Sequence, residues 1–302
     1  MENKKRTLGF LALGANCVIY GVSYISRDVV LKYLHATVIL FFQMIIMLVL
    51  FTVINLIGKK SLKIDKKDLL VIVLSGLSGT LLFQLFTVIS VQFAGPLVPS
   101  ILISLAAVIS LLTEYVLFHR KKTALGILAA LISVIGVLCI AGSSIGTFSL
   151  SSLIGYGAGI LSVVVWVAYS FISNRISGRY DQTVILNYQA IVGSITMLPF
   201  IFIFRPQSFA VLLEGEVILN LLTLGVFSST LSYFFSLYAF RHVGVTLANI
   251  AINCAFIVTI ILSIVLYGDW PGVNEVIGGL ILIASVIMLD RDEKNLKKEK
   301  EM

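Results

Sequence analysis

Residues 37–43 read TVILFFQ and residues 183–189 read TVILNYQ, so one apolar segment occurs twice, and a glutamine closes each copy. The copies start 146 positions apart, close to half of the 302 residues. A match over this distance predicts two copies of one structural unit. Other positions that match at similar offsets are Gly9 and Gly155, Tyr20 and Trp166, Gly76 and Gly225, Gly95 and Gly244, Ser104 and Asn253, and Gly126 and Gly278.

The composition places this repeat in a membrane. Apolar residues make up 59% of the chain, charged residues make up 12%, and the mean hydropathy is +1.05. A soluble domain could not bury that much apolar surface. The apolar residues fall into runs of about 20, the length that a helix needs to cross the hydrocarbon core. We therefore expect an all-α integral membrane protein with ten transmembrane helices, at about residues 8–26, 34–57, 69–90, 96–118, 123–141, 153–174, 183–204, 217–239, 245–267 and 273–290.

Ten spans place both termini on one side of the membrane, and the basic residues indicate which side. With cytoplasmic termini, 19 of the 22 Lys and Arg residues fall in inside segments, and only Arg27, Lys32 and Arg205 fall outside. This distribution follows the positive-inside rule. The net charge of +7 therefore reflects membrane topology and contact with anionic lipids, and we expect no nucleic-acid partner.

Each copy of the repeat contains five spans, and an odd number of crossings reverses the second copy relative to the first. We expect a first five-helix repeat at residues 1–147 and a second, inverted five-helix repeat at residues 148–302. Inverted repeats are typical of transporters, in which two equivalent arrangements of the halves open a central cavity to one side and then to the other. The repeat thus predicts alternating access.

Several features together resemble the EamA-like branch of the drug/metabolite transporter superfamily. They are the ten spans in two five-helix repeats, the aromatic patches Tyr20-Gly21 and Trp166-Val167-Ala168-Tyr169, the short hairpins at 93–96 and 242–244, and the glycines Gly126 and Gly278. The resemblance extends over essentially the whole chain. It implies the same fold and a transport function.

Polar side chains inside the spans are candidates for the substrate site, because a polar group in hydrocarbon is costly unless it faces the bundle or a wet cavity. Aromatic rings and amides with almost no fixed charge suit a small organic solute that is bound by stacking and hydrogen bonds. Contacts that only join helices are the alternative, above all for the serines and the two repeated glutamines. The candidate substrate-binding residues are Asn16, Tyr20, Tyr24, Gln43, Gln84, Trp166, Tyr169, Gln189, Tyr233, Asn249 and Asn253.

Gates and a coupling site are also suggested. Gly95 and Gly244 lie in short turns that we expect to be opposing gates, since glycine lets two helix ends approach closely. Glu114, well within a span, is a candidate proton site, and an interfacial carboxylate paired with Arg120 or Lys121 is the alternative. The three cysteines lie far apart inside spans, so we expect no disulfide, metal or cofactor.

These observations favour a secondary transporter over an enzyme. We expect alternating-access movement of a small organic metabolite, such as an amino acid or a related solute, across the plasma membrane, with export as the favoured direction. An integral membrane enzyme that acts on lipid-linked substrates would need clustered acids, bases or metal ligands near one interface, which the sequence lacks. A non-transporting membrane scaffold is a third alternative. Besides the solute, the expected partner is the lipid bilayer, and a homodimer is left open.

Overall fold

The computed structural model describes residues 2–119, 123–142, 150–204, 209–252, 254–268, 270 and 272–301, and these ranges contain helices and no strand. In this part of the chain seven helical stretches are long and apolar enough to cross a membrane, and shorter apolar helices stand at the three remaining predicted spans. The predicted all-α membrane fold is confirmed. The seven long stretches are Lys4–Leu31, Ala36–Ile57, Lys66–Ala94, Leu97–Leu117, Leu150–Ile176, Gln182–Ile203 and Gly215–His242, and the shorter apolar stretches, each part of a longer helix, are Ala124–Gly136, Ala255–Leu266 and Val276–Ser285.

The two halves of the chain contain the same series of elements, except that the second half has an additional 3-10 helix, η3, before its third crossing. In each half the third crossing includes a π-helical segment, η1 or η4, and the fourth crossing is divided into a short and a long helix. The first half contains α1 (Glu2–Leu31), α2 (Ala36–Ile57), α3 (Lys66–Ser75), η1 (Gly76–Phe83), α4 (Gln84–Ala94), α5 (Leu97–Leu102), α6 (Leu105–Phe118) and α7 (Ala124–Gly142). The second half contains α8 (Leu150–Ile176), α9 (Gln182–Ile203), η3 (Phe209–Leu213), α10 (Gly215–Leu222), η4 (Thr223–Leu231), α11 (Ser232–His242), α12 (Val245–Ala251), α13 (Cys254–Tyr267) and α14 (Val273–Glu301).

The repeated TVIL helices begin with equivalent caps. His35 precedes α2 and its side chain accepts a hydrogen bond from the Thr37 amide, while Asp181 precedes α9 and accepts one from the Thr183 amide at 2.9 Å. Each cap satisfies a backbone donor that has no partner within its helix. The repeated motif therefore marks the same structural event in both halves, the start of the second crossing.

Reciprocal contacts between the halves show how the repeats pack. A Cβ added at Gly76 would lie 3.1 Å from Val192 Cβ, and one added at the matching Gly225 would lie 2.5 Å from Ile46 Cδ1. Ile46 and Val192 are themselves equivalent positions, three residues after the repeated glutamines. Each π-helical segment thus has a glycine in its first three residues that packs against the second helix of the other repeat. The close approach explains why both positions lack a side chain.

Equivalent contacts also occur at the two hairpins. Gly9 of α1 faces Val243 beside the Gly244 turn, and a Cβ there would lie 2.5 Å from Val243 Cγ2. Gly155 of α8 faces Ala94 beside the Gly95 turn, with the two Cβ positions 2.6 Å apart. The first helix of each repeat is therefore packed closely against a hairpin of the other repeat.

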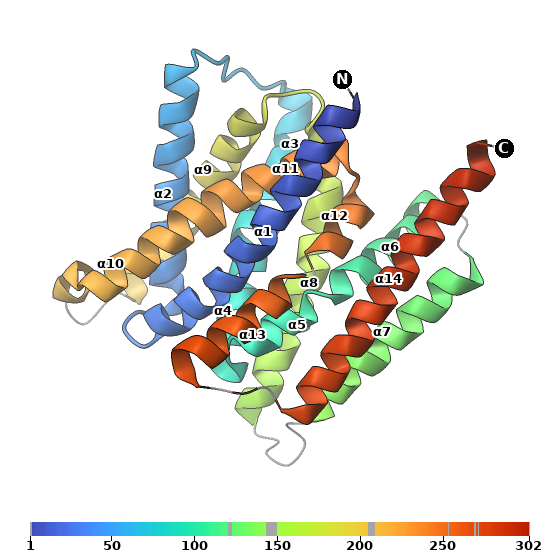
Figure 1. The fold of residues 1–302 in the computed structure, drawn as a ribbon. Coiled ribbons are helices and arrows are strands. Elements are labelled where there is room, and N and C mark those ends of the chain that lie inside the picture. The colour runs from blue at the N-terminus through green and yellow to red at the C-terminus, as the bar shows by residue number, and fades with distance from the viewer. Residues whose placement is uncertain are drawn as a thin grey trace.

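Figure 1 shows the bundle that these contacts produce. Helices α7 and α14, the last of each half, lie side by side along one edge, and their mutual contacts make them a peripheral pair. Helices α1, α2, α8 and α9 lie with η1, α4, η4 and α11 in the remaining body of the molecule. The two chain ends lie on the same side of the bundle, as an even number of crossings requires.

The structure corrects the predicted end of the first span. The sequence placed Arg27 outside the helix that spans about 8–26, but α1 continues to Leu31 and leaves the Arg27 side chain only 1% exposed. Hydrogen bonds from the guanidinium to neighbouring polar groups compensate in part for removing its charge from water. Arg27 is therefore a residue of the bundle interior, and of the three residues assigned outside, Lys32 and Arg205 are left.

Candidate substrate site between the two repeats

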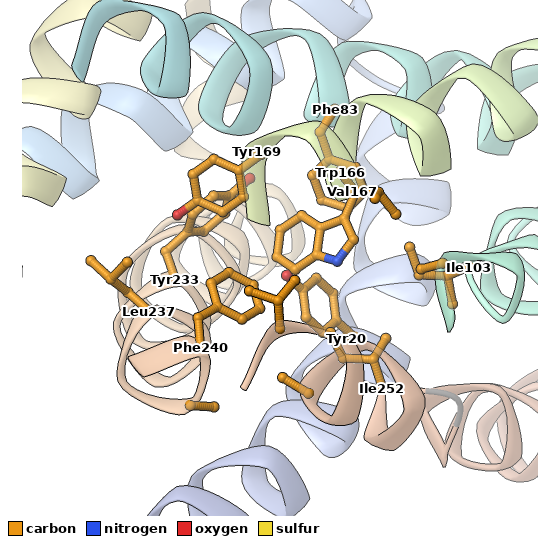
Figure 2. Packing of buried hydrophobic residues seen from close by; sticks show 14 of the residues in the cluster. Tyr20, Phe83, Ile103, Trp166, Val167, Tyr169, Tyr233, Leu237, Phe240 and Ile252 are labelled. Atoms are coloured by element: carbon orange, nitrogen blue, oxygen red, sulfur yellow. The ribbon is translucent and has the colours of Figure 1, made fainter. Parts of the chain in front are cut away.

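Aromatic rings from both halves meet at Trp166 of α8. The indole is fully buried, and five other rings surround it (Figure 2). Edge-to-face and tilted contacts of this kind add to the free energy gained by burying the rings. The centroid distances from Trp166 are 4.7 Å to Phe83, 5.3 Å to Tyr169, 5.8 Å to Tyr20, 6.0 Å to Tyr233 and 6.1 Å to Phe240. These six residues form the aromatic cluster.

A chain of polar contacts connects the aromatic cluster to the divided fourth crossings. Trp166 Nε1 donates to Asn249 Oδ1 at 3.0 Å, and Asn249 Nδ2 donates to Ser110 Oγ at 2.7 Å. Asn249 lies on α12, one turn before the break that precedes α13, and Ser110 lies on α6. The contacts join α8, α12 and α6, so two candidate residues, Trp166 and Asn249, lie side by side.

On the other side of the aromatic cluster, α1 contributes the predicted face of Asn16, Tyr20 and Tyr24. All three side chains are buried, and Asn16 Nδ2 donates to Ser236 Oγ on α11 at 2.7 Å. Tyr233, one turn earlier on α11, donates its hydroxyl to the backbone oxygen of Gly79 at 2.5 Å. Gly79 lies inside η1, where the irregular backbone presents a carbonyl to a neighbouring side chain.

The repeated glutamines have unequal surroundings. Gln189 Nε2 donates to Ser75 Oγ at 2.8 Å, and Gln189 Oε1 accepts from the Tyr169 hydroxyl at 3.5 Å. Ser173 Oγ lies 3.5 Å from the same amide nitrogen. Gln43 is also fully buried, yet neither of its amide atoms has a partner among the described residues. Equivalent positions in the repeat therefore differ in hydrogen bonding.

Sequence reasoning missed Arg27 as a component of this region. Its guanidinium donates to Ser23 Oγ at 2.8 Å, to Ser228 Oγ at 3.2 Å, and to the side-chain oxygen of Gln84, one of the predicted site residues. The signal was present in the spacing. The polar face of α1 at Asn16, Tyr20 and Tyr24 reaches Arg27 after three further residues, on the same side of a helix.

The remaining predicted residues lie away from the aromatic cluster or outside the described ranges. Glu114 is buried on α6, one turn beyond Ser110, and its role as a proton site stays a prediction. Asn253 lies outside the described residues. The structure brings the predicted residues of α1, α8, α11 and α12 together around Trp166. Gln84 and Gln189 join this group through hydrogen bonds to Arg27 and Tyr169, whereas Gln43 on α2 has no hydrogen bond to it among the described residues.

The two turn glycines are explained by backbone conformation and not by close approach. Gly95 has φ of 78° and Gly244 has φ of 105°, values that other residues rarely adopt, while an added Cβ at either position would meet nothing within 4 Å. The expectation that these glycines let helix ends approach closely is therefore wrong. The close approach at the two hairpins occurs instead at Gly9 and Gly155. The role of the turns as gates stays a prediction.

Two ion pairs join the repeats at one end of the bundle. Lys60 Nζ lies 2.8 Å from Asp181 Oδ1, and Arg179 Nη1 lies 2.6 Å from Asp68 Oδ1. Partial burial opposes ionisation of Asp181, but hydrogen bonds from Lys60 and Thr183 outweigh it and hold the pKa of this carboxyl below its ordinary value. Both carboxylates therefore bind basic partners from the other repeat.

Comparison with known proteins agrees with this geometry. The profile of the EamA-like transporter family matches residues 7–142 and, a second time, residues 153–290. The chain belongs to the EamA-like transporter family. The two family matches correspond to the two series of helices, and the resemblance seen in the sequence is confirmed. The boundary between residues 147 and 148 stays a prediction, since 143–149 lie outside the described residues.

Relatives of this EamA-like chain include two proteins of Archaeoglobus fulgidus that are named uncharacterized transporters. One is 22% identical over 283 residues, which cover 93% of this chain and 98% of the relative. The other is 25% identical over 215 residues, which cover 70% and 73%. A solved crystal structure with 17% identity covers 95% of this chain and 96% of its own at a TM-score of 0.69, a likeness in fold.

Proposed function

We propose that this EamA-like protein is a secondary transporter that moves small organic metabolites, such as amino acids or related solutes, by alternating access. The observation that supports the proposal best is the position of the aromatic cluster, since α1 and η1 of the first repeat and α8 and α11 of the second all contribute rings to it. A site shared by inverted repeats can change its access when one repeat tilts against the other.

In the described conformation the proposed site is closed. Trp166, Tyr169 and Tyr233 have no exposed surface, and their rings pack on one another. Close packing at Gly9 and Gly155 and the ion pairs of Lys60 and Arg179 hold the ends of the bundle together. Opening would break the contacts at one end and admit a solute between the rings. Export is the direction we favour, and Glu114 is the candidate for proton coupling.

Solute flux is the direct test of this function. The purified full-length protein in liposomes should accelerate counterflow of amino acids or related metabolites over empty liposomes, by well over an order of magnitude. An enzyme that acts on lipid-linked substrates would instead change its lipid substrate chemically without such flux. Absence of counterflow for every solute that stabilises the protein on binding would contradict transport.

In the orientation that we propose, the protein lies in the plasma membrane and both of its termini lie in the cytoplasm. Its basis is the distribution of Lys and Arg, in which Lys32 and Arg205 are the basic residues left outside. In a cysteine-free variant, Ser149→Cys should react with a membrane-impermeant maleimide on intact cells, and Ser61→Cys only after lysis. The reverse pattern would contradict the orientation.

A further inference from the structure

Arg27 is a buried cation whose described partners are all neutral. Its guanidinium, 1% exposed, donates to two serine hydroxyls and to the Gln84 amide oxygen. In the described part of the chain no carboxylate pairs with it, because the ion pairs there belong to Lys32, Lys60, Lys67 and Arg179. A charged group inside a membrane protein ordinarily pairs with an opposite charge or lies on a substrate or ion pathway.

The surroundings of Arg27 connect it with the aromatic cluster. The guanidinium carbon lies 5.9 Å from the Tyr24 ring centroid, and the charge also interacts electrostatically with Tyr20 and Tyr233. Tyr20 and Tyr233 also pack edge-on against Trp166. An anionic group at Arg27 would therefore lie beside rings that can hold an apolar or aromatic body.

Hydrogen-bond donors are left over on α1 and α2. Arg27 Nε and the Gln43 amide have no partner among the described residues, although both side chains are buried. In the second repeat, Ser173 Oγ lies 3.5 Å from the amide nitrogen of Gln189. Gln189 and Ser173 are the equivalents of Gln43 and Arg27, so the repeat relates these two positions. Buried donors without partners are costly, and a ligand with acceptor oxygens would satisfy them.

We propose that Arg27 binds the carboxylate of the transported solute while the aromatic cluster holds its apolar part. The inference rests on the proposed transport function and narrows it to organic carboxylates. A guanidinium matches a carboxylate because its parallel N–H groups can donate to both oxygens. The carboxylate of the bound solute would then be the counter-ion of Arg27, and the charge of Arg27 would be neutralised only when solute is bound.

Binding by the wild-type protein provides the first test. Phenylacetate and L-phenylalanine should raise the apparent melting temperature of the detergent-purified full chain, and their amides, phenylacetamide and L-phenylalaninamide, should do so only at concentrations roughly tenfold or more higher. Equal stabilisation by acid and amide would overturn the inference. Equal stabilisation by sodium chloride at the same concentrations would overturn it as well, because the bound anion would then be inorganic.

Variants at Arg27 provide the second test. Arg27→Gln should weaken phenylacetate binding roughly 10- to 100-fold and alter phenylacetamide binding less than about twofold, and Arg27→Lys should give an intermediate result. Arg175→Gln, which removes an exposed arginine of α8, is the matched control and should bind as the wild type does. If Arg27→Gln does not fold, the acid-to-amide ratio of Arg27→Lys decides, and a wild-type ratio in that variant would count against the inference.

Counterflow separates this inference from the proposed function. Flux of phenylacetamide with no preference for phenylacetate would leave a transporter whose solute is not recognised by Arg27, and the inference would fail alone. Selective, Arg27-dependent binding of phenylacetate without any flux would support the carboxylate site and contradict transport.

Discussion

Trp166→Ala should lower the free energy of unfolding by roughly 3–5 kcal/mol, the cost of removing a large buried aromatic side chain, and should abolish measurable solute binding. Five rings lose their common neighbour, and a cavity is left between α1, η1, α8 and α11. Unfolding in detergent and ligand-induced thermal shifts measure the two effects. An unfolding free energy within about 1 kcal/mol of wild type would contradict the described packing.

Because a destabilised protein can lose binding indirectly, Trp166→Phe separates the roles of packing and recognition. Phenylalanine keeps a ring in the aromatic cluster but removes the donor to Asn249 Oδ1, which should cost about 1–3 kcal/mol for the unpaired acceptor. We expect a folded protein with roughly tenfold weaker solute binding, because the smaller ring offers less aromatic surface to the solute.

The other tryptophan supplies the control for this pair of variants. Trp270 is 79% exposed, so Trp270→Phe should change neither stability nor solute binding. If Trp166→Phe bound solute as tightly as wild type, Trp166 would belong to the packing of the bundle and not to the site. Loss of binding in Trp270→Phe would show that the assay reports a general response to tryptophan replacement.

The repeated glutamines should respond differently to the same substitution. Gln189→Leu removes the partner of Ser75 and of the Tyr169 hydroxyl, so it should lower the unfolding free energy by about 1–3 kcal/mol. Gln43→Leu replaces an amide that has no described partner with an apolar side chain of similar size, and its stability should be equal to or above that of wild type. Unfolding measurements on both variants test this asymmetry.

Flux should nevertheless fall in both variants. Gln189→Leu loses the hydrogen bonds that join α9 to α3 and α8, and the Gln43 amide, which is unsatisfied among the described residues in the closed state, is available to the solute or to the open state. Counterflow at normal expression should drop several-fold for Gln43→Leu. Gln92→Leu, the same change at an exposed position of α4, is the control and should retain full flux. Full activity of Gln43→Leu would make the repeated glutamine a remnant of duplication, and equal destabilisation of both variants would contradict the described contacts.

Much of the fold could be predicted because its causes are local in sequence. Ten apolar runs of membrane-crossing length predicted ten helices, and the matching TVIL segments predicted that α2 and α9 are equivalent. The predicted face of Asn16, Tyr20 and Tyr24 follows from helical spacing alone. The same spacing, continued by three residues, includes Arg27, but a charge next to a predicted span end also indicates a membrane boundary.

Hydropathy and the repeat, both properties of the sequence itself, determined the membrane fold, the two-fold organisation and the polar residues available to a site. Only the tertiary structure decided which of these side chains meet. The hydrogen bond between Asn16 and Ser236 joins residues more than half of the chain apart, and the one between Trp166 and Asn249 joins residues more than a quarter of the chain apart. It also gave Gln189 three hydrogen-bond partners and Gln43 none among the described residues. The physical reason is that helical periodicity fixes the face on which a side chain lies, whereas its partner depends on how helices from opposite repeats rotate and pack.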